Sequence, residues 1–181
     1  MRSNKSRFYV SLYFRSGQSP PDSYHWALLV GPKHDEDHYD AMQYHVKNTI
    51  QPGVSGQPWV FEASRLGDSE TRFRLLTRVL IAKIGDPSSV DASLRSVPVV
   101  QGDPDFNCIS WVRSVIETLD AHGVLSKSKV VDWSAIDQRC RNYVAKKKAA
   151  GRWRSSPTPD SKHRSVKIPT WDMLQERETV S

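Results

Sequence analysis

The sequence has little cysteine and no long apolar run. Its 181 residues include two cysteines, Cys108 and Cys140, which excludes a disulfide framework and favours a reducing, cytoplasmic compartment. Residues 1–7 lack the apolar stretch of a secretion signal, and no segment is apolar over the length that a membrane crossing needs. We therefore expect a cytoplasmic protein with no membrane partner, long enough to bury its own core.

The common motifs for nucleotide and metal binding are also missing. The chain contains no glycine-rich phosphate loop, no Cys-x-x-Cys pair and no His-Glu-x-x-His. The sequence accordingly predicts neither a metal site nor a cofactor.

What the chain does have is an uneven excess of positive charge. It holds 26 basic and 20 acidic residues, and ten of the basic residues fall between Arg139 and Lys167 beside a single acid, Asp160. Such a segment is either a solvated surface or the binding site of an anionic partner such as tRNA. The candidate nucleic-acid contacts are Lys146, Lys147, Lys148, Arg152 and Arg154.

Hydrophobic patterning predicts an α+β fold in which an antiparallel sheet packs against helices. Runs of β-branched and aromatic residues favour strands in the first half of the chain, and the run at 73–84 suits a half-exposed strand. The expected strands are 8–14, 24–30, 42–48, 59–63 and 73–84, with loops at 16–22 and 33–40.

Helices are expected in the second half. Asp86-Pro87 should cap a short helix that runs through Arg95, and residues 107–122 carry apolar side chains at helical spacing. Ser134 and Asp137 resemble a capping box, which opens a helix to about Lys148. Beyond Gly151 no periodicity remains, so we expect a domain over 1–150 and a basic, proline-containing surface tail over 151–181.

Three residues stand out as candidates for chemistry: His25 and His45 on strands, and Cys108 at the start of a helix. A thiol in the first helical turn meets the positive end of the helix dipole and unpaired N–H groups, which favour a thiolate and can stabilise an oxyanion. A strand imidazole opposite it would serve as its base. A cysteine before an amphipathic helix can equally be a core residue, and His25 a buried strand histidine.

The segments around these residues carry a family resemblance. YHWALLVG at 24–31, YHV at 44–46 and FNCISWV at 106–112 resemble the circularly permuted papain-like, or NlpC-like, thiol enzymes, which include lecithin retinol acyltransferase. The resemblance implies a permuted papain-like fold in which His25 is the base, His45 the orienting residue and Cys108 the nucleophile. Asn48 or Glu62 could orient the base in place of His45.

A Cys–His pair of this kind transfers acyl groups through a thioester. The stretch HWALLVGPK followed by YHVKN also looks like a fungal family that we associate with arginine-containing cyclodipeptide synthases. That resemblance implies an aminoacyl-tRNA donor, a Cys108 thioester and a cyclic dipeptide product. Carboxylates at Asp103, Asp105 and Glu62 could bind an arginyl group, although Asp105 is also a candidate helix cap.

Two other functions remain open at this stage. A cysteine peptidase or amidase of the NlpC type would hydrolyse a small-molecule or peptide substrate with the same residues. A non-catalytic nucleic-acid-binding module would need only the basic segment.

Overall fold

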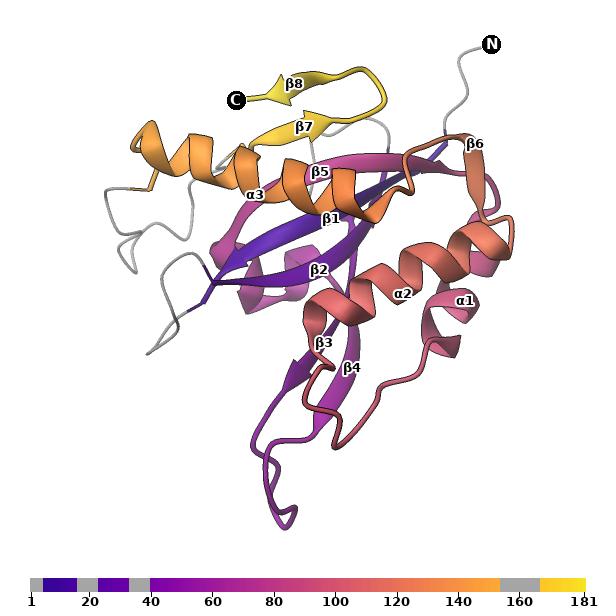
Figure 1. The fold of residues 1–181 in the computed structure, drawn as a ribbon, viewed down its shortest axis with the longest axis vertical. Coiled ribbons are helices and arrows are strands. Elements are labelled where there is room, and N and C mark those ends of the chain that lie inside the picture. The colour runs from indigo at the N-terminus through magenta and orange to yellow at the C-terminus, as the bar shows by residue number, and fades with distance from the viewer. Residues whose placement is uncertain (1–4, 16–22, 33–39, 154–166) are drawn as a thin grey trace.

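A single mixed sheet organises the part of the chain that the structure describes, with helices packed on one face (Figure 1). The structure is a computed structural model, and it describes residues 5–15, 23–32, 40–153 and 167–181. The eight strands are β1 (Arg7–Phe14), β2 (Tyr24–Gly31), β3 (Met42–Asn48), β4 (Trp59–Arg65), β5 (Leu75–Ile84), β6 (Leu125–Lys129), β7 (Thr170–Asp172) and β8 (Arg177–Val180).

The strand order is β4-β3-β2-β1-β5-β7-β8, and β6 pairs with β5 beside this path. All pairs are antiparallel except β5 with β7, which is parallel. The fold is therefore α+β, as the sequence predicted, but the expectation of a purely antiparallel sheet is wrong. β7 can pair in parallel with β5 because a long connection that contains helices separates the two strands along the chain.

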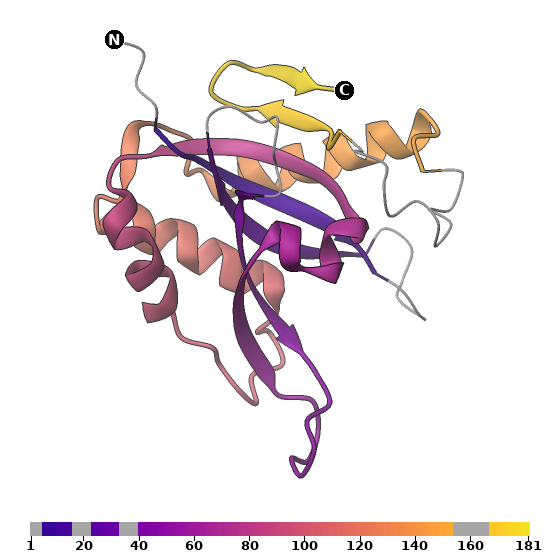
Figure 2. The same cartoon turned by 180° about the vertical axis from the view of Figure 1, so that it is seen from behind.

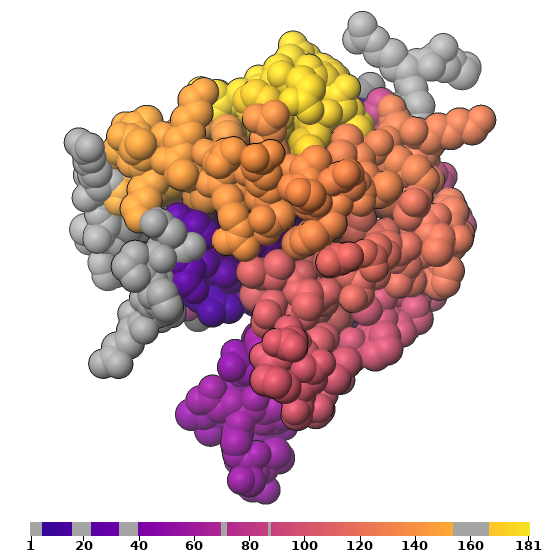
Figure 3. Space-filling model, in the orientation of Figure 1, coloured from indigo at the N-terminus to yellow at the C-terminus, as the bar shows by residue number. Residues whose placement is uncertain are grey.

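Three α-helices lie in the described residues: α1 (Val90–Ser96), α2 (Cys108–Ala121) and α3 (Trp133–Ala149). Short 3-10 turns precede them, at η2 (Leu66–Asp68), η3 (Glu70–Arg74) and η4 (Pro87–Ser89). Figure 3 shows α2 and α3 side by side over one face of the molecule, with the β3–β4 hairpin projecting below them. Figure 2 shows η2 and η3 on the opposite face of the sheet.

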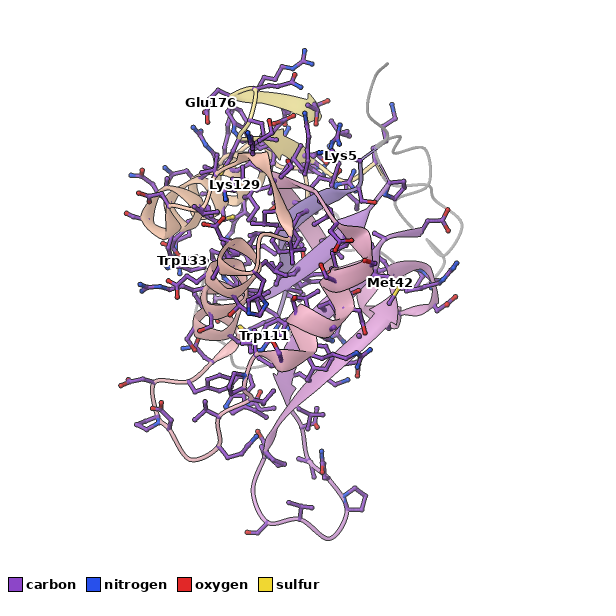
Figure 4. The ribbon with its side chains drawn as sticks, turned by 90° about the vertical axis from the view of Figure 1, so that its right-hand side faces the viewer. Lys5, Met42, Trp111, Lys129, Trp133 and Glu176 are labelled. Atoms are coloured by element: carbon purple, nitrogen blue, oxygen red, sulfur yellow. The ribbon has the colours of Figure 1, made fainter. Side chains whose placement is uncertain are left out.

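The strands separate two apolar layers because their side chains alternate between the faces. Phe8, Val10 and Leu12 of β1 belong to the core that includes the apolar faces of α2 and α3. Tyr9 and Tyr13, which alternate with them, belong to a smaller cluster on the other face. Figure 4 labels two tryptophans of the helix layer; Trp111 packs against Phe61 and Trp133 against Trp26, with ring centroids 5.8 Å and 5.9 Å apart.

Most of the predicted elements are confirmed, including the four N-terminal strands and the helices at 107–122 and 134–148. The strand predicted at 73–84 is wrong in its exposure, because nearly every residue of β5 is buried. It lies inside the sheet, between β1 and β7, so its arginine and lysine occupy an internal strand. The predicted loops at 16–22 and 33–39 lie outside the described residues.

The C-terminal segment also departs from expectation. Residues 170–180 form a hairpin, β7–β8, that extends the sheet, and Thr170 and Asp172 are buried. The prediction of an irregular tail is wrong for these residues, since three- and four-residue strands are too short to show a period. The cap of α3 is Asp132, which accepts from the backbone N–H of Ala135, in place of the predicted Ser134 box.

Candidate active site

Cys108 is the first residue of α2, and a complete capping box fixes that helix end. The side-chain oxygen of Asn107 accepts from the backbone N–H groups of Ile109 and Ser110, at 2.8 Å and 3.1 Å. The Ser110 hydroxyl accepts in return from the backbone N–H of Asn107 at 2.9 Å. Asn107 is thus the cap, which settles the alternative that the sequence left open with Asp105.

The thiol of Cys108 is buried, with 1% of its residue surface exposed, and its hydrogen-bond partner is a guanidinium. The terminal Nη2 of Arg15, just past the end of β1, lies 3.6 Å from Sγ. Cys140 lies in the middle of α3, fully buried in the core, and burial raises the pKa of its thiol. Cys108 is therefore the better candidate nucleophile of the two.

His25, His45 and Glu62 form a chain of hydrogen-bonding groups across three strands, which we call the histidine relay. The Nε2 of His25 lies 2.8 Å from Nδ1 of His45, and the Nε2 of His45 lies 3.3 Å from Oε1 of Glu62. His45 and Glu62 are direct partners in the β3–β4 register. The structure thus brings together His25 and two of the three groups proposed to orient it; Asn48, the third, is exposed at the end of β3.

The relay allows an assignment of the two imidazole protons. A hydrogen bond to a charged carboxylate is stronger than one between neutral groups, so we assign the Nε2 proton of His45 to Glu62. The Nδ1 of His45 then accepts from Nε2–H of His25. This leaves the Nδ1 of His25 unprotonated, with the lone pair that a general base needs.

Burial and nearby charges set the protonation of the relay. Burial is the largest influence on His25 and, together with the charges of His45, Arg15 and Lys47, lowers its pKa to about 3. Burial also lowers the pKa of His45, although Glu62 opposes the change. Both imidazoles are consequently neutral near pH 7.

Glu62 completes the relay as a charged group. Its partial burial acts to raise its pKa, but hydrogen bonds from Lys47 and His45 outweigh that effect and leave the pKa lowered. Lys47, two residues beyond His45 on β3, forms an ion pair with the other carboxylate oxygen. Glu62 is therefore held between a lysine and a histidine, which argues against its predicted role as a contact for an arginyl substrate.

Two further polar residues support the relay and were missed by the sequence reasoning. Tyr13 donates its hydroxyl proton to Oε1 of Gln43 at 2.8 Å, which holds the Gln43 side chain against the ring of His45. The Nε2 of Gln43 lies 3.4 Å from Nε2 of His45, and because both nitrogens carry protons in this assignment, that contact is packing. Tyr13 is the direct β1 partner of His25. The sequence contained a signal for Gln43, because alternate residues of a strand share a face, and Gln43 and Lys47 lie two residues before and after His45.

The thiol and the relay lie in different layers of the fold. Cys108 belongs to the core between sheet and helices, whereas His25 shares its face of β2 with Ala27 and Leu29 of the other cluster. No hydrogen bond joins Cys108 to His25 in the described part of the chain. The connection runs through Arg15, which contacts the thiol and whose charge acts on His25.

The backbone pairing of β2 with β3 ends before the relay begins. Backbone pairs join β2 and β3 only at residues 28–30 and 42–44. His25 and His45 lie beyond these backbone pairs, and the hydrogen bond between their side chains joins β2 to β3 at that point. α2 packs against β2 and β3.

The predicted acidic contacts lie in the loop before α2. Asp103 and Asp105 are exposed, and the Oδ1 of Asp103 accepts from the backbone N–H of Asp105 at 2.9 Å. Asp105 in turn presents its carbonyl to the side chain of Asn107 at 3.3 Å. These aspartates shape the turn that leads into the capping box, and no hydrogen bond or ion pair links them to the relay within the described residues.

The predicted nucleic-acid contacts lie in the last turn of α3 and just beyond it. Lys147 forms an ion pair with Glu178 of β8 and lies 5.7 Å from the ring centroid of Tyr143. Lys146 and Lys148 are exposed near the end of the helix. Arg152 donates to the carbonyl of Lys167 at 2.7 Å. The fifth predicted contact, residue 154, lies outside the described residues.

The described residues contain no group of three or more His, Cys, Asp or Glu side chains placed to hold a metal ion. Within the same residues, no helix combines the length and apolarity that a membrane crossing needs.

Fold and site together define an α+β protein with a buried thiol at a capped helix start and a neutral histidine relay across the adjoining strands. The chain belongs to a family of unknown function (DUF6914), whose model matches residues 5–180. No curated protein and no solved structure matches it.

Proposed function

We propose that the protein is a cysteine-dependent acyltransferase in which Cys108 is the nucleophile and His25 the general base. The observation that carries the proposal is the relay from His25 through His45 to Glu62, because such a chain fixes the ring and tautomer of a base. The Asn107 cap takes the N–H groups of Ile109 and Ser110, so the candidate donor for an oxyanion at the start of α2 is the backbone N–H of Cys108 itself.

The proposed chemistry has two steps. His25 takes the proton of the Cys108 thiol, and the sulfur attacks the acyl carbon of an ester. The carbon–oxygen bond then breaks, and His25 gives the proton to the leaving oxygen. An acceptor amine then attacks the thioester, Nδ1 of His25 takes the amine proton, and the thiolate leaves. Cys108 and His25 must come into contact for both steps; in proteins without substrate such contacts are often long and shorten in the complex.

We further propose that the acyl donor is an aminoacyl-tRNA and the product a cyclic dipeptide, as the sequence resemblance implies. The acceptor amine then belongs to a second aminoacyl-tRNA, and the free amine of the resulting dipeptide attacks its own ester carbonyl, which closes the ring and releases the second tRNA. Lys146, Lys148 and Arg152 are exposed near the end of α3, and this end lies on the same side of the molecule as the end of β1 and the start of β2 (Figure 1). A polyanion bound there would reach toward Arg15 and His25. Basic side chains at a helix C-terminus also complement the helix dipole, so this support is secondary to the relay.

The test is the mass of the intact protein after exposure to a pool of charged tRNAs, with cyclic dipeptides measured in the same reaction. Wild type and the matched control Cys140→Ala should each gain one aminoacyl group, and Cys108→Ala should gain none. Loss of the base should slow thioester turnover in His25→Gln by about 10²- to 10⁴-fold.

Each part of the proposal has its own contradicting result. An adduct that persists in Cys108→Ala would exclude this cysteine as the nucleophile. Turnover of peptide amides without RNA would favour the peptidase or amidase alternative. Function that survives in both Cys108→Ala and His25→Gln would favour the non-catalytic nucleic-acid-binding module.

A further inference from the structure

The guanidinium of Arg15 is the charged group in contact with the candidate nucleophile. Its Nη2 lies 3.6 Å from Sγ of Cys108, within the range of a hydrogen bond to sulfur. Arg15 is partly buried at the end of β1, and the thiol is covered. A cation held against a buried sulfur stabilises its thiolate form more strongly than the same cation in water would.

His25 does not carry this positive charge in the resting protein. In a papain-type pair a protonated imidazole balances the thiolate, which requires a histidine that holds its proton near neutral pH. Burial and the charges of His45, Arg15 and Lys47 have the opposite effect and lower the pKa of His25 to about 3. A neutral His25 can accept a proton during the reaction, but it cannot balance a thiolate beforehand.

The other nearby cation is already paired. Lys47 forms an ion pair with Glu62, at the far end of the relay from His25. Of the basic side chains in the described residues, Arg15 is the one that a hydrogen bond joins to Cys108. A guanidinium also stays charged at any pH relevant to an enzyme, unlike an imidazole.

We propose that Arg15 is a catalytic residue that balances the charge of the Cys108 thiolate, while His25, neutral at rest, carries protons between the reacting groups. This assignment rests on the proposed function, in that it takes Cys108 as the nucleophile. It divides between two residues the tasks that one histidine performs in a papain-type pair. Arg15 supplies the positive charge beside the sulfur, and the relay holds the imidazole that moves protons.

Alkylation of Cys108 by two reagents of similar size tests the assignment without any substrate. Iodoacetate is an anion and iodoacetamide is neutral, so the ratio of their rate constants reports the charge beside the sulfur. Slow access to a buried thiol affects both reagents and cancels in the ratio. Peptide mass spectrometry assigns the reaction to Cys108.

Removal of the cation should lower the iodoacetate to iodoacetamide ratio about tenfold in Arg15→Gln, since a local charge of one sign changes encounter rates by this order or more. The ratio should stay near the wild-type value in Arg15→Lys, which keeps the charge. It should also stay there in His25→Gln and in Arg7→Gln, the matched change at the other end of β1. Circular dichroism checks that each variant folds. If Arg15→Gln does not fold, the wild-type ratio decides the test, because a cation beside the sulfur should raise it above the ratio that free cysteine gives.

Three results would overturn the assignment. These are an unchanged ratio in Arg15→Gln, a fall in His25→Gln as large as the fall expected for Arg15→Gln, and a wild-type Cys108 that neither reagent modifies. If the ratio behaves as expected but no aminoacyl adduct forms with charged tRNAs, the charge pair stands and the proposed acyl donor fails.

Discussion

The buried relay should make the folded protein sensitive to mild acid through His25. Its pKa is lowered to about 3 in the folded protein, by burial first and then by neighbouring positive charge. In the unfolded chain the imidazole has its ordinary pKa of about 6.5. As the pH falls below 6.5, the unfolded chain takes up a proton that the folded protein does not, so unfolding becomes more favourable. The stability linked to His25 is therefore complete above pH 7 and is lost between about pH 6.5 and 3.

The size of the effect follows from the pH interval. At about 1.4 kcal/mol per pH unit, acidification from pH 7 to 5 should lower the free energy of unfolding by about 2 kcal/mol through His25 alone. This figure hardly depends on the folded pKa, because the folded imidazole stays neutral at pH 5 as long as that pKa is below about 4. His45, whose pKa is also lowered, adds a loss in the same direction.

Urea denaturation of wild type and His25→Gln at pH 7 and pH 5 measures the effect. Between the two pH values, wild type should lose about 2 kcal/mol more stability than the variant, because glutamine does not titrate. His122→Gln, at an exposed histidine beyond the end of α2, is the matched control and should follow the wild type. Equal losses in wild type and His25→Gln would refute the burial of a neutral imidazole in the relay.

Three further predictions concern the ends of α2 and α3. Asn107→Ala removes the side-chain acceptor for two backbone N–H groups and should lower the free energy of unfolding by about 1–2 kcal/mol, whereas Asn107→Ser should keep most of it; equal urea midpoints for the two variants would contradict the cap. Lys147→Ala breaks the pair with Glu178 and should cost up to about 1 kcal/mol in a thermal melt. Lys146→Ala should leave stability unchanged but weaken tRNA binding and its salt dependence, and wild-type affinity would mean that this lysine is only a solvated residue.

The sequence predicted the site's histidines and thiol because strong local patterns surround them. β2 is a largely aromatic and aliphatic run, YHWALLVG, that ends in glycine, so His25 could be placed on a strand. α2 has apolar residues at helical spacing directly after Asn107 and Cys108, so the thiol could be placed in its first turn. Patterns of this kind depend only on neighbours along the chain.

What the sequence could not predict depends on register and on which face each strand presents. Arg15 follows a strand, and its sequence context is that of an ordinary surface residue; only the fold shows that its side chain reaches the first residue of α2. The face of His25 relative to Cys108 follows from the pairing of β2 with β1 and β3, which no local pattern specifies. β7 and β8 were missed for a related reason, since their stability comes from pairing with β5 and from the contact of Tyr143 with Glu178.

The charge of Arg15 has opposite effects on the two halves of the candidate site, the thiol of Cys108 and the imidazole of His25. Its charge favours a negative sulfur at Cys108 and, at the same time, lowers the pKa of His25. Removing the charge should therefore weaken the nucleophile and strengthen the base together, so the acid limb of a pH–rate profile should move toward higher pH in Arg15→Gln. A residue that only supported the fold would lower the rate without moving that limb. Arg15 hydrogen-bonds to the thiol and its charge acts on His25, so this one substitution tests both halves of the candidate site together.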